Sequence, residues 1–193
     1  MAAALRFDFL VVYAVGLLVV ALRTIGTLGP RQRGERGASG ARRYLSAILI
    51  PLQFVVPPLA LLLRAGELDA EVPAVRLVGA AFGVYAACIQ LWASATLGRF
   101  LVPRTVVFAD HQLVTSGPYR FVRHPIYSGN VALVLGTALA TLNVAVLLVC
   151  PIVIAGMLLQ ARAEEDLLEA RFGPDYRAYA RRTGRLVPRF GRD

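Results

Sequence analysis

Charged residues are scarce in this sequence, and lysine is missing altogether, so that all 21 basic residues are arginine. Charged residues make up 17% of the 193 residues, whereas hydrophobic residues make up 57%. The mean hydropathy of +0.61 lies far above that of ordinary soluble domains. The composition therefore excludes an ordinary soluble domain and predicts that the chain folds in a lipid bilayer.

Cysteine and histidine are also scarce, with two of each in the chain. Cys88 and Cys150 lie within apolar runs, far from a second thiol and from a histidine at metal-ligand spacing, so neither a disulfide nor a zinc site is expected. The sequence lacks the G-x-G-x-x-G, P-loop, G-x-S-x-G and H-E-x-x-H motifs. Their absence excludes the common nucleotide-binding and hydrolytic sites.

Long stretches without charge predict an all-α integral membrane protein with five transmembrane helices. The stretch from Ile126 to Gln160 has 35 uncharged residues. One straight helix of that length would measure about 52 Å, which far exceeds a hydrocarbon core of about 30 Å. We therefore expect a tight helical hairpin that turns near Thr141 to Asn143. The other spans cover residues 7–28, 44–63 and 74–97, and the first is expected to be a retained helix, not a signal peptide.

The charges between the spans predict the orientation of the chain. The loops at 29–43 and 98–123 are rich in arginine, whereas the loop at 64–73 carries acidic residues. The positive-inside rule then places the two basic loops and the C-terminus in the cytoplasm and the N-terminus outside, in a bacterial inner (plasma) membrane. This bias accounts for the net charge of +9, and no nucleic-acid partner is expected. The β-branched pieces of the 98–123 segment could form short extended segments, but a cytoplasmic loop is favoured there.

Two polar clusters flank the predicted hairpin, "GPYRFVRHP" before it and "EEDLLEARFGPDYRAYARR" after it. Because a hairpin returns the chain to the side that it left, the two clusters must lie together at the cytoplasmic mouth of the last two spans. The second cluster reads as a helix prolonged out of the fifth span, stopped at Gly173 and Pro174, and followed by a short amphipathic helix on the membrane surface.

Adjacent carboxylates at the membrane boundary call for cationic partners. Glu164 and Glu165 lie directly after the uncharged stretch, where an unpaired carboxylate is costly. The partners that topology brings near them are Arg123, His124 and Arg182.

These two clusters resemble the C-terminal core of the isoprenylcysteine carboxyl methyltransferase family and of its phospholipid methyltransferase relatives. The resemblance covers residues 95–190 and rests on "SGPYRFVRHPIYSGN" and "EEDLLEARFGPDYRAYARRTGRLVP". It implies an integral membrane enzyme that binds S-adenosylmethionine between the last hairpin and the C-terminal tail, and that methylates a lipophilic acceptor arriving from the bilayer. Residues 1–193 would form a single membrane domain, with three N-terminal helices in 1–97 and the methyltransferase core in 98–193.

The resemblance also implies roles for individual residues. The residues implied in binding S-adenosylmethionine, which leaves as S-adenosylhomocysteine, are His124, Tyr127, Glu164, Glu165, Gly117, Tyr119, Tyr176, Tyr179 and Pro188. The residues implied in acceptor binding and catalysis are Arg123, Arg182 and Glu165. No metal is required, because methyl transfer is an in-line displacement that depends on positioning and desolvation.

Several alternatives stay open at this point. An arginine fork suits O-methylation of a carboxylate or a hydroxyl group, whereas N-methylation of a phospholipid amine or S-methylation of a thiol are the rival reactions. A non-enzymatic membrane scaffold or transporter subunit is the alternative from another class. Read without the family, His124 is a headgroup contact, the arginines are membrane anchors, and Tyr119 and Tyr127 belong to an interfacial aromatic belt.

Overall fold

The structure is a computed structural model, and it describes residues 8–11, 13–14, 36–37, 52–98, 106–107 and 112–189. Helices dominate this part of the chain, as the all-α prediction requires. They are α3 (Val56–Leu62), α4 (Pro73–Leu97), the one-turn 3₁₀ helix η3 (Gly117–Arg120), α5 (Pro125–Thr141), α6 (Val144–Phe172) and α7 (Pro174–Arg182).

A short strand pair lies in the 98–123 segment, where a loop was favoured over short extended segments. β2 (Val106–Val107) pairs in antiparallel fashion with β1 (Arg36–Gly37), so the extended alternative is the one observed there. The physical reason is that two adjacent β-branched valines favour extended backbone. The pairing brings the first and third interhelical segments to the same end of the molecule, which agrees with the alternation of loop charge.

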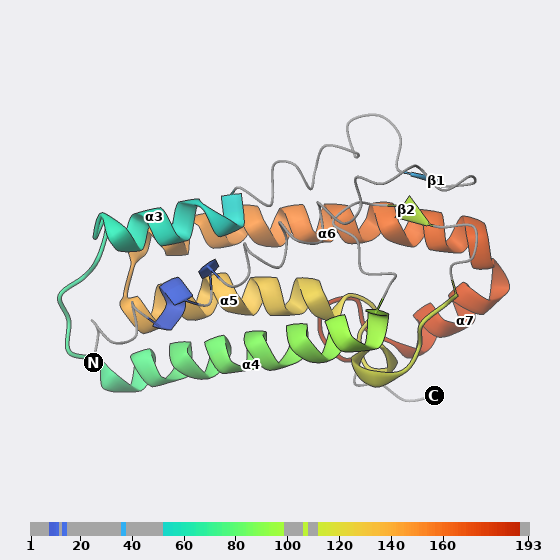
Figure 1. Cartoon of the computed structure of the whole chain (residues 1–193), viewed down its shortest axis with the longest axis horizontal. Coiled ribbons are helices and arrows are strands. Elements are labelled where there is room, and N and C mark those ends of the chain that lie inside the picture. Colours follow the sequence, from blue (N-terminus) through green and yellow to red (C-terminus); the bar gives the residue numbers. More distant parts are fainter. Residues whose placement is uncertain are drawn as a thin grey trace.

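The central helix is α5, which lies between α4 and α6, with α3 running along α6 (Figure 1). The predicted turn near Thr141 to Asn143 is confirmed. Leu142 takes the left-handed conformation, with φ 51° and ψ 45°, and the Asn143 side chain caps α6 by accepting a 2.9 Å hydrogen bond from the Val146 N–H. A left-handed residue followed by an N-cap reverses the chain within two residues.

Small residues bring the backbones of α4 and α5 into close contact. A Cβ atom on Gly79 would lie 2.2 Å from the Ala140 nitrogen, and a Cβ atom on Gly136 would lie 2.8 Å from the Gly79 carbonyl oxygen. Neither distance is possible for real atoms, so only glycine fits at both positions. This is the small-residue packing by which membrane helices associate without a hydrophobic driving force.

A buried arginine joins the first turn of α4 to the last turn of α5. Arg76 is 6% exposed, and its Nη1 donates to the Ala140 carbonyl at 3.0 Å. Its Nη2 donates to the Ala70 carbonyl at 3.2 Å. A cation is favourable at this point, because the carbonyl end of a helix carries partial negative charge.

Helix α6 extends beyond the uncharged stretch, as predicted. Its uncharged part, residues 144–161, measures about 27 Å and matches the thickness of a bilayer core, and the part from Arg162 onward continues outside it. The helix ends at Gly173, where φ is 52°, and Pro174 begins α7. The predicted stop and restart at these two residues are therefore confirmed.

Two of the described helices, α4 and α6, are long and apolar enough to cross a membrane. Their outward side chains include Leu77, Val84, Leu91, Leu148 and Ile152, each more than half exposed. Of the other predicted spans, 7–28 lies mostly outside the described residues, and 44–63 is described only from residue 52. The count of five spans and the orientation in the membrane thus stay predictions.

The α4–α5 contact generates the first prediction. Replacing Gly79 with leucine forces the two helices apart, and we expect the melting temperature in detergent to fall by about 5–10 °C, as overpacking by about 2–3 kcal/mol implies. The matched control is Ala81→Leu, because Ala81 lies on the exposed side of α4 and the same side chain fits there. Equal melting temperatures for the two variants would contradict the close packing.

Candidate active site

The segment after α7 returns to the start of α5, and the two pair through their backbones. The Arg123 N–H donates to the Gly184 carbonyl at 2.9 Å. The His124 N–H donates to the Arg185 carbonyl at 3.1 Å, and the Gly184 N–H donates back to the Phe121 carbonyl at 3.2 Å. The C-terminal tail is thus fixed against the residues that begin the hairpin, which confirms that the two polar clusters meet.

Pro125 explains why the backbone of Arg123 and His124 is free to pair with the tail. The residue before a proline is excluded from the helical region, and His124 accordingly has φ −127° and ψ 64°. Helix α5 therefore begins only at Pro125, and the N–H groups of Arg123 and His124 point outward. The Ser128 hydroxyl, one turn into α5, extends the same contact by donating to the Leu186 carbonyl.

The Glu165 carboxylate is the centre of the cluster, because three cationic side chains converge on it. Arg123 donates through Nε at 2.8 Å, Arg185 donates through Nε at 3.0 Å, and His124 Nε2 lies at 3.3 Å. Burial by itself would raise the pKa of Glu165, but these hydrogen bonds, from His124, Arg185 and Arg123, outweigh it and hold the pKa well below its usual range. Glu165 therefore stays ionised over the physiological pH range.

The guanidinium of Arg123 donates its hydrogen bonds to other groups of the protein. Besides its bond to Glu165, its Nη1 donates to the Ala180 carbonyl at 2.9 Å and to the Thr183 carbonyl. Arg123 thus connects α6, the last turn of α7 and the tail. This placement differs from the expectation of an arginine that faces the acceptor.

Glu164 has fewer partners than Glu165 and is more accessible. It accepts a hydrogen bond from the Tyr127 hydroxyl and lies 3.5 Å from His124 Nδ1. Its side chain is 26% exposed, against 13% for Glu165. The structure thus places Glu164 at the rim of the cluster and Glu165 inside it.

The imidazole of His124 lies between the two carboxylates. The ring is buried and stacks on Tyr127, with 5.4 Å between ring centroids and 6° between planes. Burial would lower the pKa of His124, but its hydrogen bonds with Glu164 and Glu165 raise the pKa above the ordinary value.

The two tail tyrosines differ in one respect that their sequence does not show. The Tyr179 hydroxyl donates to the Tyr119 carbonyl at 2.7 Å, so Tyr179 fastens α7 to η3. The Tyr176 hydroxyl is buried without a hydrogen-bond partner, although the residue is only 3% exposed. Burial raises the pKa of Tyr179 to about 12 and that of Tyr176 further, so both hydroxyls keep their protons at neutral pH. Tyr176 therefore holds a free donor beside the Glu165 cluster.

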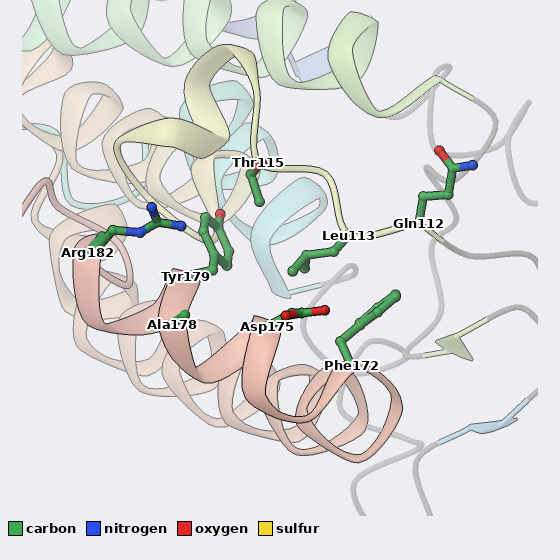
Figure 2. A pocket seen from close by; sticks show the side chains of 8 residues that line it. All are labelled: Gln112, Leu113, Thr115, Phe172, Asp175, Ala178, Tyr179 and Arg182. Carbon is green, nitrogen blue, oxygen red and sulfur yellow. The ribbon is translucent and has the colours of Figure 1, made fainter.

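A cavity of about 540 Å³ lies beside α7, and Tyr179 is one of its lining residues (Figure 2). Arg182 and Asp175 project into it from two successive turns of α7, with the small Ala178 between them. Its remaining lining residues are Gln112, Leu113, Thr115 and Phe172. Its size suits a small organic molecule. Of the predicted site residues, Arg182 and Tyr179 line this cavity.

Three residues complete the comparison with the predicted site. Gly117, with φ 57°, lies against Thr96 and Trp92 of α4, where a side chain would collide. Pro188 is exposed on the tail. Arg185 was missed as a site residue, although the sequence signal was present, since this arginine precedes the L-x-P of the family motif.

No group of three or more His, Cys, Asp or Glu side chains within the described ranges is placed to hold a metal ion. The two cysteines are free, Cys88 exposed on α4 and Cys150 buried in α6. The candidate site is thus built from arginine, histidine, tyrosine and carboxylate side chains.

Comparison with known families identifies the class of protein. The family described as phospholipid methyltransferase matches residues 75–175, which is more than half of the chain and runs from the first turn of α4 to the start of α7. The chain therefore belongs to the phospholipid methyltransferase family, and the predicted family resemblance is confirmed. The two apolar helices agree with the membrane setting that this family suggests.

Two curated bacterial relatives match a shorter part of the chain. A cobalt-zinc-cadmium resistance protein of Cupriavidus metallidurans is 39% identical over 80 residues, or 42% of this chain. A nickel-cobalt-cadmium resistance protein of Alcaligenes xylosoxydans xylosoxydans is 35% identical over 78 residues, or 40% of this chain. The match spans 37% of the length of each relative.

The Glu165 cluster generates a prediction about stability. Glu165→Gln leaves two partly buried guanidinium groups without their carboxylate, and we expect an unfolding free energy lower by at least about 2 kcal/mol. The measurement is the melting temperature in detergent. The control is Glu169→Gln, which removes only an exposed ion pair with Arg177 and is expected to cost less than about 0.5 kcal/mol.

The pH dependence of the melting temperatures of wild type and Glu165→Gln tests whether the stabilisation by Glu165 is ionic. The lowered pKa of Glu165 means that its stabilisation is present above its ordinary pKa of 4.5 and is lost as the pH falls. The raised pKa of His124 means that its contribution is complete below 6.5 and is lost as the pH rises through the folded-state value. The difference in melting temperature between wild type and Glu165→Gln should be largest from about pH 4.5 to 6.5. A pH-independent difference would contradict the ionic cause.

Proposed function

We propose that this protein transfers the methyl group of S-adenosylmethionine to a carboxylate oxygen of a lipophilic acceptor, where the tail closes on the start of α5. The observation that carries the proposal is the contrast within one cluster. Glu165 is satisfied by three cations, whereas the neighbouring Glu164 carboxylate is partly exposed and the Tyr176 hydroxyl has no partner. We propose that this end of the molecule lies at the cytoplasmic face of a bacterial plasma membrane, as the arginine distribution predicts.

The unused groups fit the amino-acid end of the cofactor. An ammonium group suits the Glu164 carboxylate, and a carboxylate suits the buried Tyr176 hydroxyl together with Arg185, whose side chain is 33% exposed. When bound, S-adenosylmethionine supplies an electrophilic methyl group on a sulfonium centre. Glu165 offsets part of the charge of Arg123 and Arg185, which reduces their repulsion of a cationic ligand.

The cavity beside α7 supplies the groups for the acceptor. Arg182 forms no ion pair with any described residue, so its guanidinium is available to a carboxylate in two-pronged geometry. Phe172 and Leu113 line the same cavity and suit an apolar chain. We propose that Arg182 orients the acceptor carboxylate and that the acceptor's apolar part extends toward the membrane.

The electrostatics of the cluster favour a carboxylate over a hydroxyl or an amine as acceptor. A carboxylate at neutral pH needs no base, because the O–C bond forms as the C–S bond breaks and opposite charges cancel. A hydroxyl or an ammonium group must first lose a proton, and Glu165 is a weak base because its pKa is lowered. The chain's task is then to orient the oxygen, hold the reacting groups together and exclude water.

Phospholipid N-methylation is the second candidate, and the description of the matching family favours it. Asp175, in the same cavity as Arg182, is the group that would suit an amine. The printed names of the two curated relatives refer to metal resistance, and the matched region covers 37% of each.

The tail tyrosines provide a test of cofactor binding. Tyr176→Phe removes a hydroxyl that bonds to nothing in the protein, so we expect an unchanged or higher melting temperature and about tenfold weaker binding of S-adenosylhomocysteine. Tyr179→Phe removes a made hydrogen bond, so we expect about 1 kcal/mol less stability and binding within about twofold of wild type. Thermal unfolding and calorimetry in detergent measure both. Identical effects of the two variants would contradict the assignment.

The nature of the methylated atom provides the test of the reaction. Membranes containing the protein are incubated with S-adenosylmethionine labelled in its methyl group and with lipid extract, and the labelled product is treated with mild base. A methyl ester releases labelled methanol, whereas an N-methyl amine, a thioether or a methyl ether keeps its label. We expect release of the label.

Arg182→Ala completes this test. It should lower the product yield at least about tenfold while leaving the affinity for S-adenosylhomocysteine unchanged, because it removes only an acceptor contact. Base-stable label would overturn the ester in favour of the other acceptors, and the absence of any labelled lipid would count against methyl transfer to lipid.

A further inference from the structure

Residues 184–188, which follow α7, form a tail turn that carries apolar side chains on its outside. A Cβ atom on Gly184 would collide with the carbonyl group of Val187, so the backbone of these two residues is in close contact. The Val187 side chain is 71% exposed, and Pro188 beside it is exposed as well. Phe121, which is 45% exposed, lies at the base of the turn, because its carbonyl accepts the Gly184 N–H at 3.2 Å. Three exposed apolar residues thus belong to two segments that pair directly.

The tail turn lies beside the helices of the bundle and not beyond their ends. The Ser128 hydroxyl, one turn into α5, donates to the Leu186 carbonyl of the turn. The next residue of α5, Gly129, packs against Gln90 of α4, since a Cβ atom on Gly129 would lie 2.6 Å from the Gln90 Cγ. These contacts place the tail turn at about the level of Gln90 along α4.

Lipid is the expected surrounding at this level. Leu91 of α4 is 72% exposed, and α4 is long and apolar enough to cross a membrane. Residues 92–97 of the same helix are uncharged and extend about 9 Å further toward the end that carries the site. Leu91 and Val187 are therefore side chains of nearly equal exposure at about one level, the first on a spanning helix and the second on the tail.

Helix α7 does not offer its large apolar side chains to the bilayer. Tyr176 and Tyr179 are 3% and 5% exposed, because they face the rest of the protein. The exposed polar side chains of α7 are all charged, namely Asp175, Arg177, Arg181 and Arg182. Apolar contact between the C-terminal tail and the bilayer therefore falls to the tail turn and not to α7.

Two arginines flank the exposed apolar side chains. The Arg120 Cζ lies 4.4 Å from the centroid of the Phe121 ring, a stacking contact that uses none of its N–H donors. Arg189 directly follows Pro188, and its Nη1 donates to the Arg181 carbonyl at 2.9 Å while its other N–H groups remain. Within the described part of the chain, neither guanidinium forms an ion pair with a carboxylate. Lipid phosphates are the anions that such a pair would meet at a membrane surface.

We propose that the tail turn is a contact surface for anionic phospholipid. Val187, Pro188 and Phe121 enter the edge of the hydrocarbon layer. Arg120 and Arg189 bind the phosphate groups above it. An anionic lipid is favoured over a zwitterionic one, because it brings a net negative charge to two arginines. The inference goes beyond the proposed methyl transfer and does not depend on it.

The fluorescence of one tryptophan in lipid nanodiscs tests the depth of the turn. The natural tryptophan, Trp92, is replaced by phenylalanine, and Val187→Trp or Leu91→Trp is added to the full chain. Lipids brominated in their acyl chains quench a tryptophan that reaches hydrocarbon, whereas iodide quenches one in water. We expect brominated lipid to quench Val187→Trp to within about twofold of Leu91→Trp.

Arg177→Trp in the same background is the control for a side chain in water, since Arg177 is exposed on α7. Iodide should quench Val187→Trp at least about threefold less than Arg177→Trp. Iodide quenching of Val187→Trp that equals that of Arg177→Trp, without quenching by brominated lipid, overturns the proposal. If the melting curve shows that Val187→Trp does not fold, Pro188→Trp takes its place and the same result decides.

The preference for anionic lipid is measured on the Val187→Trp protein. Brominated phosphatidylglycerol and brominated phosphatidylcholine are compared at equal mole fraction. One arginine near the surface favours an anionic lipid by about fivefold, so we expect phosphatidylglycerol to be preferred by at least about fivefold. Adding Arg120→Gln and Arg189→Gln together should bring the ratio near one.

The matched control adds Arg64→Gln and Arg177→Gln, which remove the same charge from two exposed, ion-paired arginines outside the tail turn. This control should keep the preference for phosphatidylglycerol. Equal quenching by the two lipids in the presence of Arg120 and Arg189, or an equal loss of preference in the control, overturns the contact with anionic lipid. Because neither measurement involves S-adenosylmethionine, a failure here leaves the proposed methyl transfer standing.

Discussion

The carboxylate of Glu165 is the interaction on which the rest of the site depends. It receives one cation from the residues before α5 and one from the tail, Arg123 and Arg185, and it belongs to α6, the second arm of the hairpin. Three segments that are distant in sequence are thus tied to one pair of oxygens. Because each partner compensates charge that would otherwise be unpaired at a membrane boundary, none of the three segments can leave without a penalty to the others.

The apolar helices α4 and α5 impose a second constraint, which is close packing of their backbones without charged contacts. Gly79 and Gly136 let α4 and α5 meet backbone to backbone, so the position of the first residues of α5 is set by packing over the length of the helix. Arg76 secures the far end of the same pair through a helix terminus. The packed helices and the ion cluster at the start of α5 therefore together fix the position of Glu164.

Much of this arrangement follows from the sequence, because it depends on local rules. The length of the uncharged stretch requires a hairpin, Pro125 dictates where α5 begins, and Gly173 with Pro174 divides α6 from α7. The meeting of the two polar clusters is a consequence of that topology alone. The short strand at Val106–Val107 was the less favoured expectation, because strand formation there requires a partner from a distant part of the chain.

The division of labour among the site residues could not be predicted in the same way. Adjacent glutamates are equivalent in a sequence, and only the packing of the tail decides which one is enclosed by cations. The same holds for Tyr176 and Tyr179, which share a helix but not a hydrogen-bond partner. Arg185 carried a sequence signal, but its contact with Glu165 depends on the backward turn of the chain after α7.

The pairing of the tail with the start of α5 has a consequence for biosynthesis. Arg185 is translated after Glu165, to which its side chain is bonded, and the N–H groups of Arg123 and His124 bond to carbonyls that are translated about sixty residues later. A nascent chain can therefore insert its helices while its site is still open. The tail can pair with the start of α5 only after it has left the ribosome, and a chain truncated before Gly184 would lack this pairing.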